Sequence, residues 1–126
     1  MTRLYLARHG QTEWNRLSKV QGRTDIELSE TGIIQAKLLA KRMKRENIDV
    51  IYSSNLKRAL KTAEAIAEYK NFSINESEKY QEICFGPWEG MTINEIKKKY
   101  SEDYRIYKED PVNFTLPGAE TFLELS

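Results

Sequence analysis

The sequence contains very little histidine and cysteine. Among its 126 residues there is one histidine, His9, and one cysteine, Cys84. A single cysteine forms no disulfide within the chain, which suits a reducing compartment, and we expect a cytoplasmic protein. A zinc site of the usual nitrogen and sulfur type is disfavoured, so we expect no metal. Any chemistry that requires an imidazole must use His9.

An excess of charge of one sign and long apolar runs are also missing. The 20 Lys and Arg nearly balance the 19 Asp and Glu, which gives a formal net charge of +1. This balance provides no bulk electrostatic attraction to nucleic acid or to an anionic membrane. No apolar run approaches the roughly 20 residues of a membrane helix, and the N-terminus lacks the apolar stretch of a secretion signal. We therefore expect neither a nucleic-acid partner nor a membrane partner.

The apolar pattern predicts an α/β domain. Unbroken apolar residues at 4–7 and 50–52 predict buried strands, and the first is expected to be covered on both faces. Apolar residues at helical spacing predict helices over 30–45, with Ser29 as N-cap, and over 56–69. Strand and helix alternate in this order, which indicates parallel βαβ units.

The remaining elements are expected to be shorter. One helical turn is predicted within 12–17 and a short strand at 72–74. Thr92 and Glu95 form a capping-box pattern, which predicts a helix through about residue 100 and on toward residue 107. A last helix is expected to begin close to the end of the sequence.

Two basic residues follow the predicted strands. Arg8 and His9 precede Gly10 at the end of the first strand, and Arg58 lies in the first turn of the helix after the second strand. Ligands of open α/β sheets bind beyond the carboxyl ends of the strands. A cation and an imidazole beside a flexible glycine predict an anion site there.

Four groups of short motifs lie along the sequence: Arg8-His9-Gly10 with Thr12 and Asn15, Gln21-Gly22, Ser53-Ser54 with Arg58-Ala59 and Thr62-Ala63, and Glu82 with residues 85–90. Together they resemble the signature of the histidine phosphatase superfamily, also called the phosphoglycerate mutase-like family. That resemblance implies a three-layer α/β/α fold with a mostly parallel sheet. The Trp-Glu-Gly form of the last motif is closer to the family's phosphatases than to its mutases.

The resemblance also implies roles for individual residues. His9 would be the nucleophile that carries the phosphoryl group, Arg8 and Arg58 would be catalytic arginines, and Glu82 would be the general acid. Gln21 and Gly22 either line the phosphate loop or only shape it. Neither a cofactor nor a metal is implied. The residues expected to bind phosphate are Arg8, Asn15, Gln21, Gly22 and Arg58.

The sequence departs from the family pattern beyond these motifs. The family has a second catalytic histidine, and this sequence has none, so the resemblance covers the N-terminal two-thirds of the family domain as one C-terminally incomplete domain over residues 1–126. One missing donor to developing charge typically costs about 10²–10³ in rate, so slow turnover is expected.

We expect a metal-independent phosphomonoesterase for small phosphorylated metabolites, similar to α-ribazole phosphatases or broad-specificity phosphatases. One alternative is a phosphoglycerate mutase-type phosphotransferase. The other is a truncated, catalytically weak protein that binds phosphate esters or a partner. Self-association through an open sheet edge is a further expectation, because unpaired strand edges accept other chains.

Overall fold

The computed structural model describes residues 1–125, which form two compact units. Unit 1 comprises Met1–Thr12 and Glu27–Tyr80. Unit 2 comprises Glu13–Ile26 and the chain from Gln81 onward. Each unit is therefore assembled from two separate segments of the sequence.

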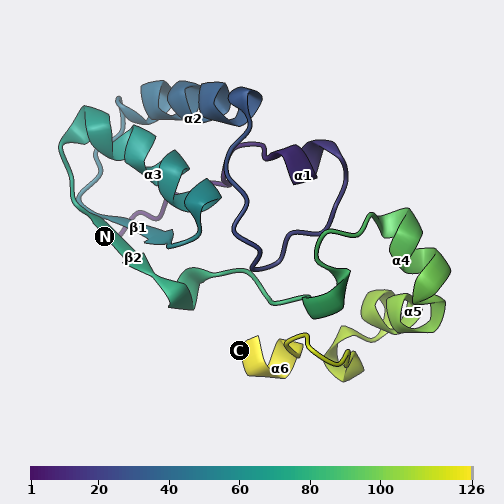
Figure 1. Ribbon diagram of the computed structural model, residues 1–126. Coiled ribbons are helices and arrows are strands. Elements are labelled where there is room, and N and C mark those ends of the chain that lie inside the picture. Colours follow the sequence, from purple (N-terminus) through teal and green to yellow (C-terminus); the bar gives the residue numbers. More distant parts are fainter. Residues whose placement is uncertain (126) are drawn as a thin grey trace. The chain divides into compact units, whose positions relative to one another are not determined.

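Unit 1 is an α/β unit with a two-stranded parallel sheet (Figure 1). The helix α3 connects the two strands, and α2 packs against α3. A parallel pair joined through a helix is the βαβ arrangement, so the predicted α/β class is confirmed. The elements of unit 1 are α2 (Glu30–Met43), β1 (Ile51–Ser54), α3 (Lys57–Lys70), β2 (Ile74–Ser77) and the 3-10 helix η1 (Glu78–Tyr80).

The two long helices of unit 1 follow the sequence pattern closely. Ala36 and Ala40 of α2 are buried, as are Ala63 and Ala67 of α3, and such small side chains allow two helices to approach. Ser29 caps α2, because its hydroxyl oxygen accepts a hydrogen bond from the N–H of residue 32 at 3.1 Å. Both predicted helices and the predicted N-cap are confirmed, with small shifts at the helix ends.

The opening segment differs from its prediction. Residues 4–7 form no strand, and Leu4 and Leu6 keep 84% and 94% of their surface exposed. An apolar strand needs paired neighbours and covering helices to become buried. Within residues 1–125, no strand pairs with residues 4–7. The strand predicted at 50–52 is present as β1, although Tyr52 is exposed. The strand predicted at 72–74 begins only at Ile74.

Unit 2 is organised around the buried Trp88. The indole ring centroid lies 5.1 Å from that of Phe114 and 5.6 Å from that of Tyr107, at inclined angles that favour aromatic contact. Ile96 of α4 and Leu116 complete the buried cluster. The elements of unit 2 are α1 (Glu13–Arg16), η2 (Gly86–Trp88), α4 (Ile93–Lys99), α5 (Ser101–Glu109), η3 (Pro111–Asn113) and α6 (Phe122–Leu125).

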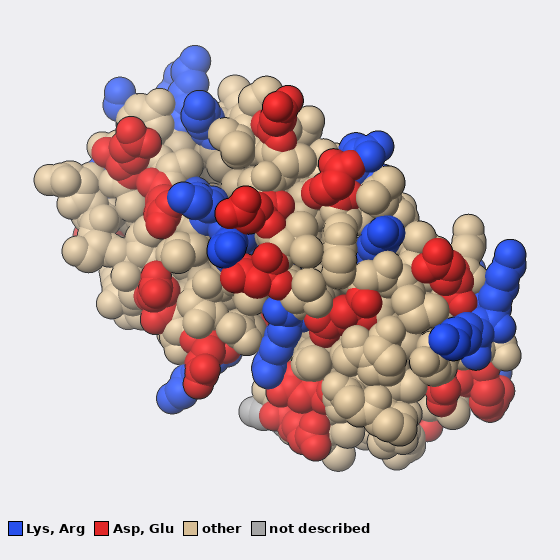
Figure 2. All heavy atoms as spheres, in the orientation of Figure 1, with Lys and Arg blue, Asp and Glu red and all other residues tan. Residues whose placement is uncertain are grey.

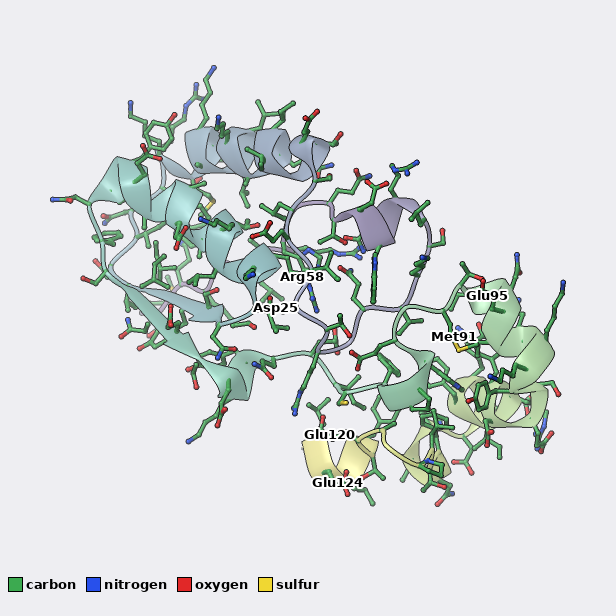
Figure 3. The ribbon with its side chains drawn as sticks, viewed as in Figure 1. Asp25, Arg58, Met91, Glu95, Glu120 and Glu124 are labelled. Carbon is green, nitrogen blue, oxygen red and sulfur yellow. The ribbon has the colours of Figure 1, made fainter. Side chains whose placement is uncertain are left out.

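The capping box of α4 is present. The Thr92 hydroxyl oxygen accepts from the Glu95 N–H at 3.2 Å, and the Glu95 carboxylate accepts from the Thr92 N–H at 3.0 Å (Figure 3). The helix predicted to continue toward residue 107 is interrupted, because Tyr100 has φ −128° and ψ 44°, outside the helical region. The chain therefore forms α4 and α5 in succession. The helical turn predicted within 12–17 and the last helix are also present.

Candidate active site

The ring of His9 is oriented by the residue that follows it. Nδ1 lies 2.7 Å from the carbonyl oxygen of Gly10, and the side chain is half-buried. A carbonyl oxygen can only accept a hydrogen bond, so Nδ1 carries the proton. In the neutral imidazole, Nε2 then keeps the lone pair. In this tautomer Nε2 is the unprotonated ring nitrogen.

Gly10 is held on both sides of its α-carbon. Its N–H donates to Thr62 Oγ1 at 3.0 Å, and its carbonyl accepts from His9. A Cβ atom at Gly10 would lie 2.4 Å from the backbone oxygen of Gly32 in α2. Only glycine fits this position, because the segment passes directly against the helix backbone.

The next residue, Gln11, is fixed to the start of α2. Its N–H donates to the side-chain oxygen of Gln35 at 2.8 Å, and its carbonyl accepts from the N–H of Ser29 at 2.9 Å. The backbone of residues 9–11 is therefore held by α2 on one side and by Thr62 of α3 on the other.

Arg58 lies in the first turn of α3 with only 4% of its surface exposed (Figure 3). Its carbonyl oxygen accepts from the hydroxyl of Thr62 at 2.8 Å. Guanidinium groups stay charged when buried, and their planar donors match the oxygens of a phosphoryl group. Within unit 1, the hydroxyl of Thr62 therefore hydrogen-bonds both to the carbonyl of the buried Arg58 and to the N–H of Gly10, the residue after His9. Arg8, by contrast, is exposed.

Four of the predicted site residues belong to unit 2. Asn15 lies in α1 and is half-buried, and Gln21 accepts from the N–H of Thr24 through its carbonyl at 2.9 Å. Gly22 has φ +53°, and a Cβ atom there would lie 2.4 Å from Oε2 of Glu89. This positive φ lies in the left-handed region, which favours glycine at this turn of the loop.

Glu82 is exposed, and its Oε1 accepts from the N–H of Ile83 at 2.9 Å. It lies close enough to α5 to affect Tyr107. Burial, followed by the nearby Tyr104 and the Glu82 carboxylate, raises the pKa of Tyr107. The Glu82 carboxylate therefore lies near Tyr107, one of the aromatic side chains that contact Trp88.

Glu89 anchors the loop that carries Gln21 and Gly22. Its carboxylate accepts from the N–H of Thr24 and from the N–H of Phe85, at 2.8 and 2.9 Å, and also from the hydroxyl of Thr24. Burial raises the pKa of Glu89, but the hydrogen bonds from Thr24 and the backbone amides outweigh burial, so its pKa lies below the ordinary value.

Arg23 supports the backbone of Glu82. Its Nε donates to the Glu82 carbonyl at 2.9 Å, and its Nη2 donates to Oε1 of Glu120 at 3.0 Å. The other oxygen of Glu120 accepts from the N–H of Cys84 at 3.2 Å (Figure 3). These contacts, and the one made by Thr62, were not foreseen from the sequence, although Thr62, Glu89 and Glu120 lie inside the matched motifs or beside them.

The predicted site residues divide between the two units. Arg8, His9 and Arg58 belong to unit 1, whereas Asn15, Gln21, Gly22 and Glu82 belong to unit 2. The structure links His9 and Arg58 through Thr62. The catalytic roles themselves remain predictions.

The described residues contain neither a cluster of metal ligands nor a membrane-crossing helix. In residues 1–125, no group of three or more His, Cys, Asp and Glu side chains could hold a metal ion. No helix of that same stretch is long and apolar enough to cross a membrane. Basic and acidic side chains are interspersed over the face in view (Figure 2).

The sequence profile of the histidine phosphatase superfamily (branch 1) matches residues 4–126. The chain belongs to this superfamily, as its motifs had indicated.

Three related proteins illustrate the likeness. Phosphoserine phosphatase 1 of Hydrogenobacter thermophilus is 46% identical over 121 residues, which are 96% of this chain and 57% of that protein. The phosphoserine phosphatase of Entamoeba histolytica, solved with 3-phosphoglyceric acid, is 45% identical with a TM-score of 0.76, covering 87% of this chain and 54% of that one. Bacillus stearothermophilus YhfR is 33% identical with a TM-score of 0.85, covering 94% and 58%.

These likenesses confirm the phosphoglycerate mutase-like α/β fold. The chain spans between 54% and 58% of the length of these three relatives.

Proposed function

We propose that the chain carries the nucleophilic part of a metal-independent phosphomonoesterase, with His9 as the residue that becomes phosphorylated. The observation that supports this most directly is the hydrogen bond from His9 Nδ1 to the Gly10 carbonyl, at 2.7 Å. This bond supports Nε2 as the nitrogen that attacks, in the unit that also holds the buried Arg58.

The reaction proceeds in two displacements at phosphorus. Nε2 of His9 forms a bond to phosphorus while the ester P–O bond breaks, and the departing alkoxide takes a proton from Glu82. Water then attacks the phosphohistidine and gives a proton to the Glu82 carboxylate while the P–N bond breaks, which releases inorganic phosphate and restores both the neutral imidazole and the protonated Glu82. Dividing the reaction in this way replaces one difficult step by two easier ones.

Arg58 and Arg8 neutralise the phosphoryl oxygens in this scheme. Their N–H groups donate to oxygens whose negative charge otherwise repels a nucleophile. Asn15 supplies an uncharged amide donor. Gln21 and Gly22 belong to the loop anchored by Glu89, and they either contact the phosphate or only shape that loop.

For the substrate, we propose a small phosphorylated metabolite, with O-phosphoserine as the first compound to test. The two relatives with 45% and 46% identity carry the name phosphoserine phosphatase. A histidine-to-alanine variant of the Entamoeba histolytica enzyme was solved in complex with phosphoserine. α-Ribazole phosphate and nitrophenyl phosphate serve as comparison substrates for a narrower and a broader specificity.

The decisive experiment is to label the protein with a radioactive phosphodonor in the presence of a chelator. We expect an adduct that is labile to acid and stable to alkali, as a phosphohistidine is. The label should disappear in His9→Ala and persist in Cys84→Ala, which removes the one thiol. A label that persists in His9→Ala would exclude His9 as the nucleophile.

The same preparation separates the alternatives. A phosphatase releases phosphate from 3-phosphoglycerate or phosphoserine without a primer, whereas a mutase isomerises 3-phosphoglycerate and depends on 2,3-bisphosphoglycerate. A protein that binds vanadate but accepts no label and turns over no ester would be the catalytically weak binding protein.

A further inference from the structure

The hydroxyl of Thr62 makes two hydrogen bonds in the buried part of unit 1. Its oxygen accepts from the N–H of Gly10 at 3.0 Å, and its O–H donates to the carbonyl of Arg58 at 2.8 Å. The side chain is 5% exposed. One buried hydroxyl therefore joins the residue after the nucleophile to the backbone of the buried arginine.

The connection extends to the imidazole through Gly10. The N–H and the carbonyl of Gly10 belong to successive peptide groups. Thr62 holds the first group, and the second accepts from Nδ1 of His9. Whatever fixes the Gly10 backbone therefore fixes the acceptor that selects the tautomer of His9.

Helix formation alone does not explain this threonine. A serine or threonine within a helix often donates to the carbonyl four residues earlier, and that bond is local. The bond from Gly10 spans 52 residues of sequence. Alanine is the better helix former, and Ala63 and Ala67 occupy buried positions of the same helix. The hydroxyl supplies a link that alanine could not.

We propose that Thr62 is a positioning residue, an inference that rests on the proposed role of His9 as nucleophile. Thr62 keeps the Gly10 carbonyl aligned with Nδ1 of His9, so that the proton stays on Nδ1 and Nε2 stays nucleophilic. It also holds the His9 segment at a fixed place relative to the first turn of α3, where Arg58 lies. It acts through these residues and does not touch the substrate.

Nitrogen NMR of the imidazole tests the proposal directly, because His9 is the sole histidine, so both ring signals belong to it, and their couplings to the ring protons distinguish Nδ1 from Nε2. In the unaltered protein with neutral imidazole, we expect the proton on Nδ1. Thr62→Val keeps the side-chain shape and loses the hydroxyl. It should shift the tautomer ratio toward Nε2–H by up to about tenfold, since a neutral hydrogen bond contributes about 0.5–1.5 kcal/mol.

Two further variants identify the cause of any shift. Thr62→Ser retains the hydroxyl and should restore the ratio seen in the unaltered protein. Ile66→Val removes a methyl group from another buried position of α3 and should leave the tautomer unchanged. A folded Thr62→Val protein with an unaltered tautomer would overturn the proposal.

The unaltered protein provides a test that needs no variant. The Gly10 amide should exchange slowly with deuterium, because it is buried and donates to Thr62. Rapid exchange of this amide would overturn the proposal even if Thr62→Val failed to fold.

Kinetics separate this inference from the proposed function. Phosphorylation of His9 should be slowed by up to about tenfold in Thr62→Val and restored in Thr62→Ser, following the tautomer ratio. If no variant is ever phosphorylated, the proposed function fails while the tautomer result stands. If phosphorylation is rapid in every variant, the function holds and the role of Thr62 fails.

Discussion

Arg58 is a buried arginine of unit 1, and its proposed role is to bind phosphate. A charged side chain that is 4% exposed needs partners that compensate for lost hydration. Arg58→Ala should weaken the binding of phosphate, vanadate or tungstate by about tenfold or more, since each charge-assisted hydrogen bond contributes about 1.5–3 kcal/mol. Titration calorimetry measures the affinity. Arg105→Ala removes an exposed arginine of α5 as a control, and equal affinities in the two variants would remove Arg58 from the site.

Glu82 should act as the proton donor to the leaving group. Glu82→Gln cannot donate a proton, so it should slow esters with basic leaving alcohols much more than nitrophenyl phosphate, whose leaving anion needs little protonation. Steady-state rates for phosphoserine and nitrophenyl phosphate give the comparison. Glu76→Gln, at an exposed position of β2, is the matched control. Equal slowing of both substrates would indicate a structural role for Glu82.

At the scale of elements, the loop held by Glu89 should be sensitive to acid. The pKa of Glu89 lies below its ordinary value of 4.5, so the carboxylate stabilises the folded state above that pH and loses this effect as the pH falls through the lower folded value. Glu89→Gln should therefore be less stable than the unaltered protein at pH 7, by about 1.5–3 kcal/mol if one charge-assisted hydrogen bond is lost.

Tryptophan fluorescence during denaturation by urea measures this effect in unit 2, because both tryptophans, Trp14 and Trp88, belong to that unit. The difference in stability between the two proteins should shrink as the pH falls below the ordinary value of 4.5 and through the lower pKa that Glu89 has in the folded state. A difference that stays constant between pH 7 and pH 3 would contradict the assignment to Glu89.

The elements also show what a sequence can specify. Local patterns were sufficient for α2, α3 and the capping box of α4, because the residues that determine them lie within a few positions of each other. The apolar runs at 4–7 and 50–52 look alike, yet only the second finds a strand partner within residues 1–125. Pairing depends on distant segments, and the run itself carries no information about them.

The candidate site shows the same contrast between local motifs, which a sequence displays, and long-range contacts, which it does not. Arg8, His9 and Arg58 were named from short motifs that follow the predicted strands, and their roles stay predictions. Three hydrogen bonds that hold the site segments join residues far apart in the sequence. The separations are 52 positions for Gly10 and Thr62, 65 for Thr24 and Glu89, and 97 for Arg23 and Glu120. A bond of that kind leaves no periodic signal, so the contacts made by Thr62, Glu89 and Arg23 emerged only with the structure.

For the whole molecule, we expect self-association. Leu4 and Leu6 are exposed in an apolar segment that forms no strand, and the two-stranded sheet has unpaired edges as far as residues 1–125 are concerned. Such edges and segments pair with other chains. Sedimentation velocity should show larger species as the concentration rises. The double variant Leu4→Lys with Leu6→Lys should reduce them, whereas Val112→Lys, which changes an exposed apolar residue of unit 2, should not. A monomer at every concentration would contradict this expectation.

The interleaving of the two units has a consequence for how the protein is made. Unit 1 needs residues up to Tyr80, and unit 2 needs residues 13–26 together with those from Gln81 onward. A ribosome that has released the first 80 residues has therefore delivered all of unit 1, while residues 13–26 still await their partners. Chains fold from the N-terminal side during synthesis. The His9 segment can therefore pack against α2 and α3 before the residues from Gln81 onward, which the loop with Gln21 and Gly22 contacts in unit 2, have been made.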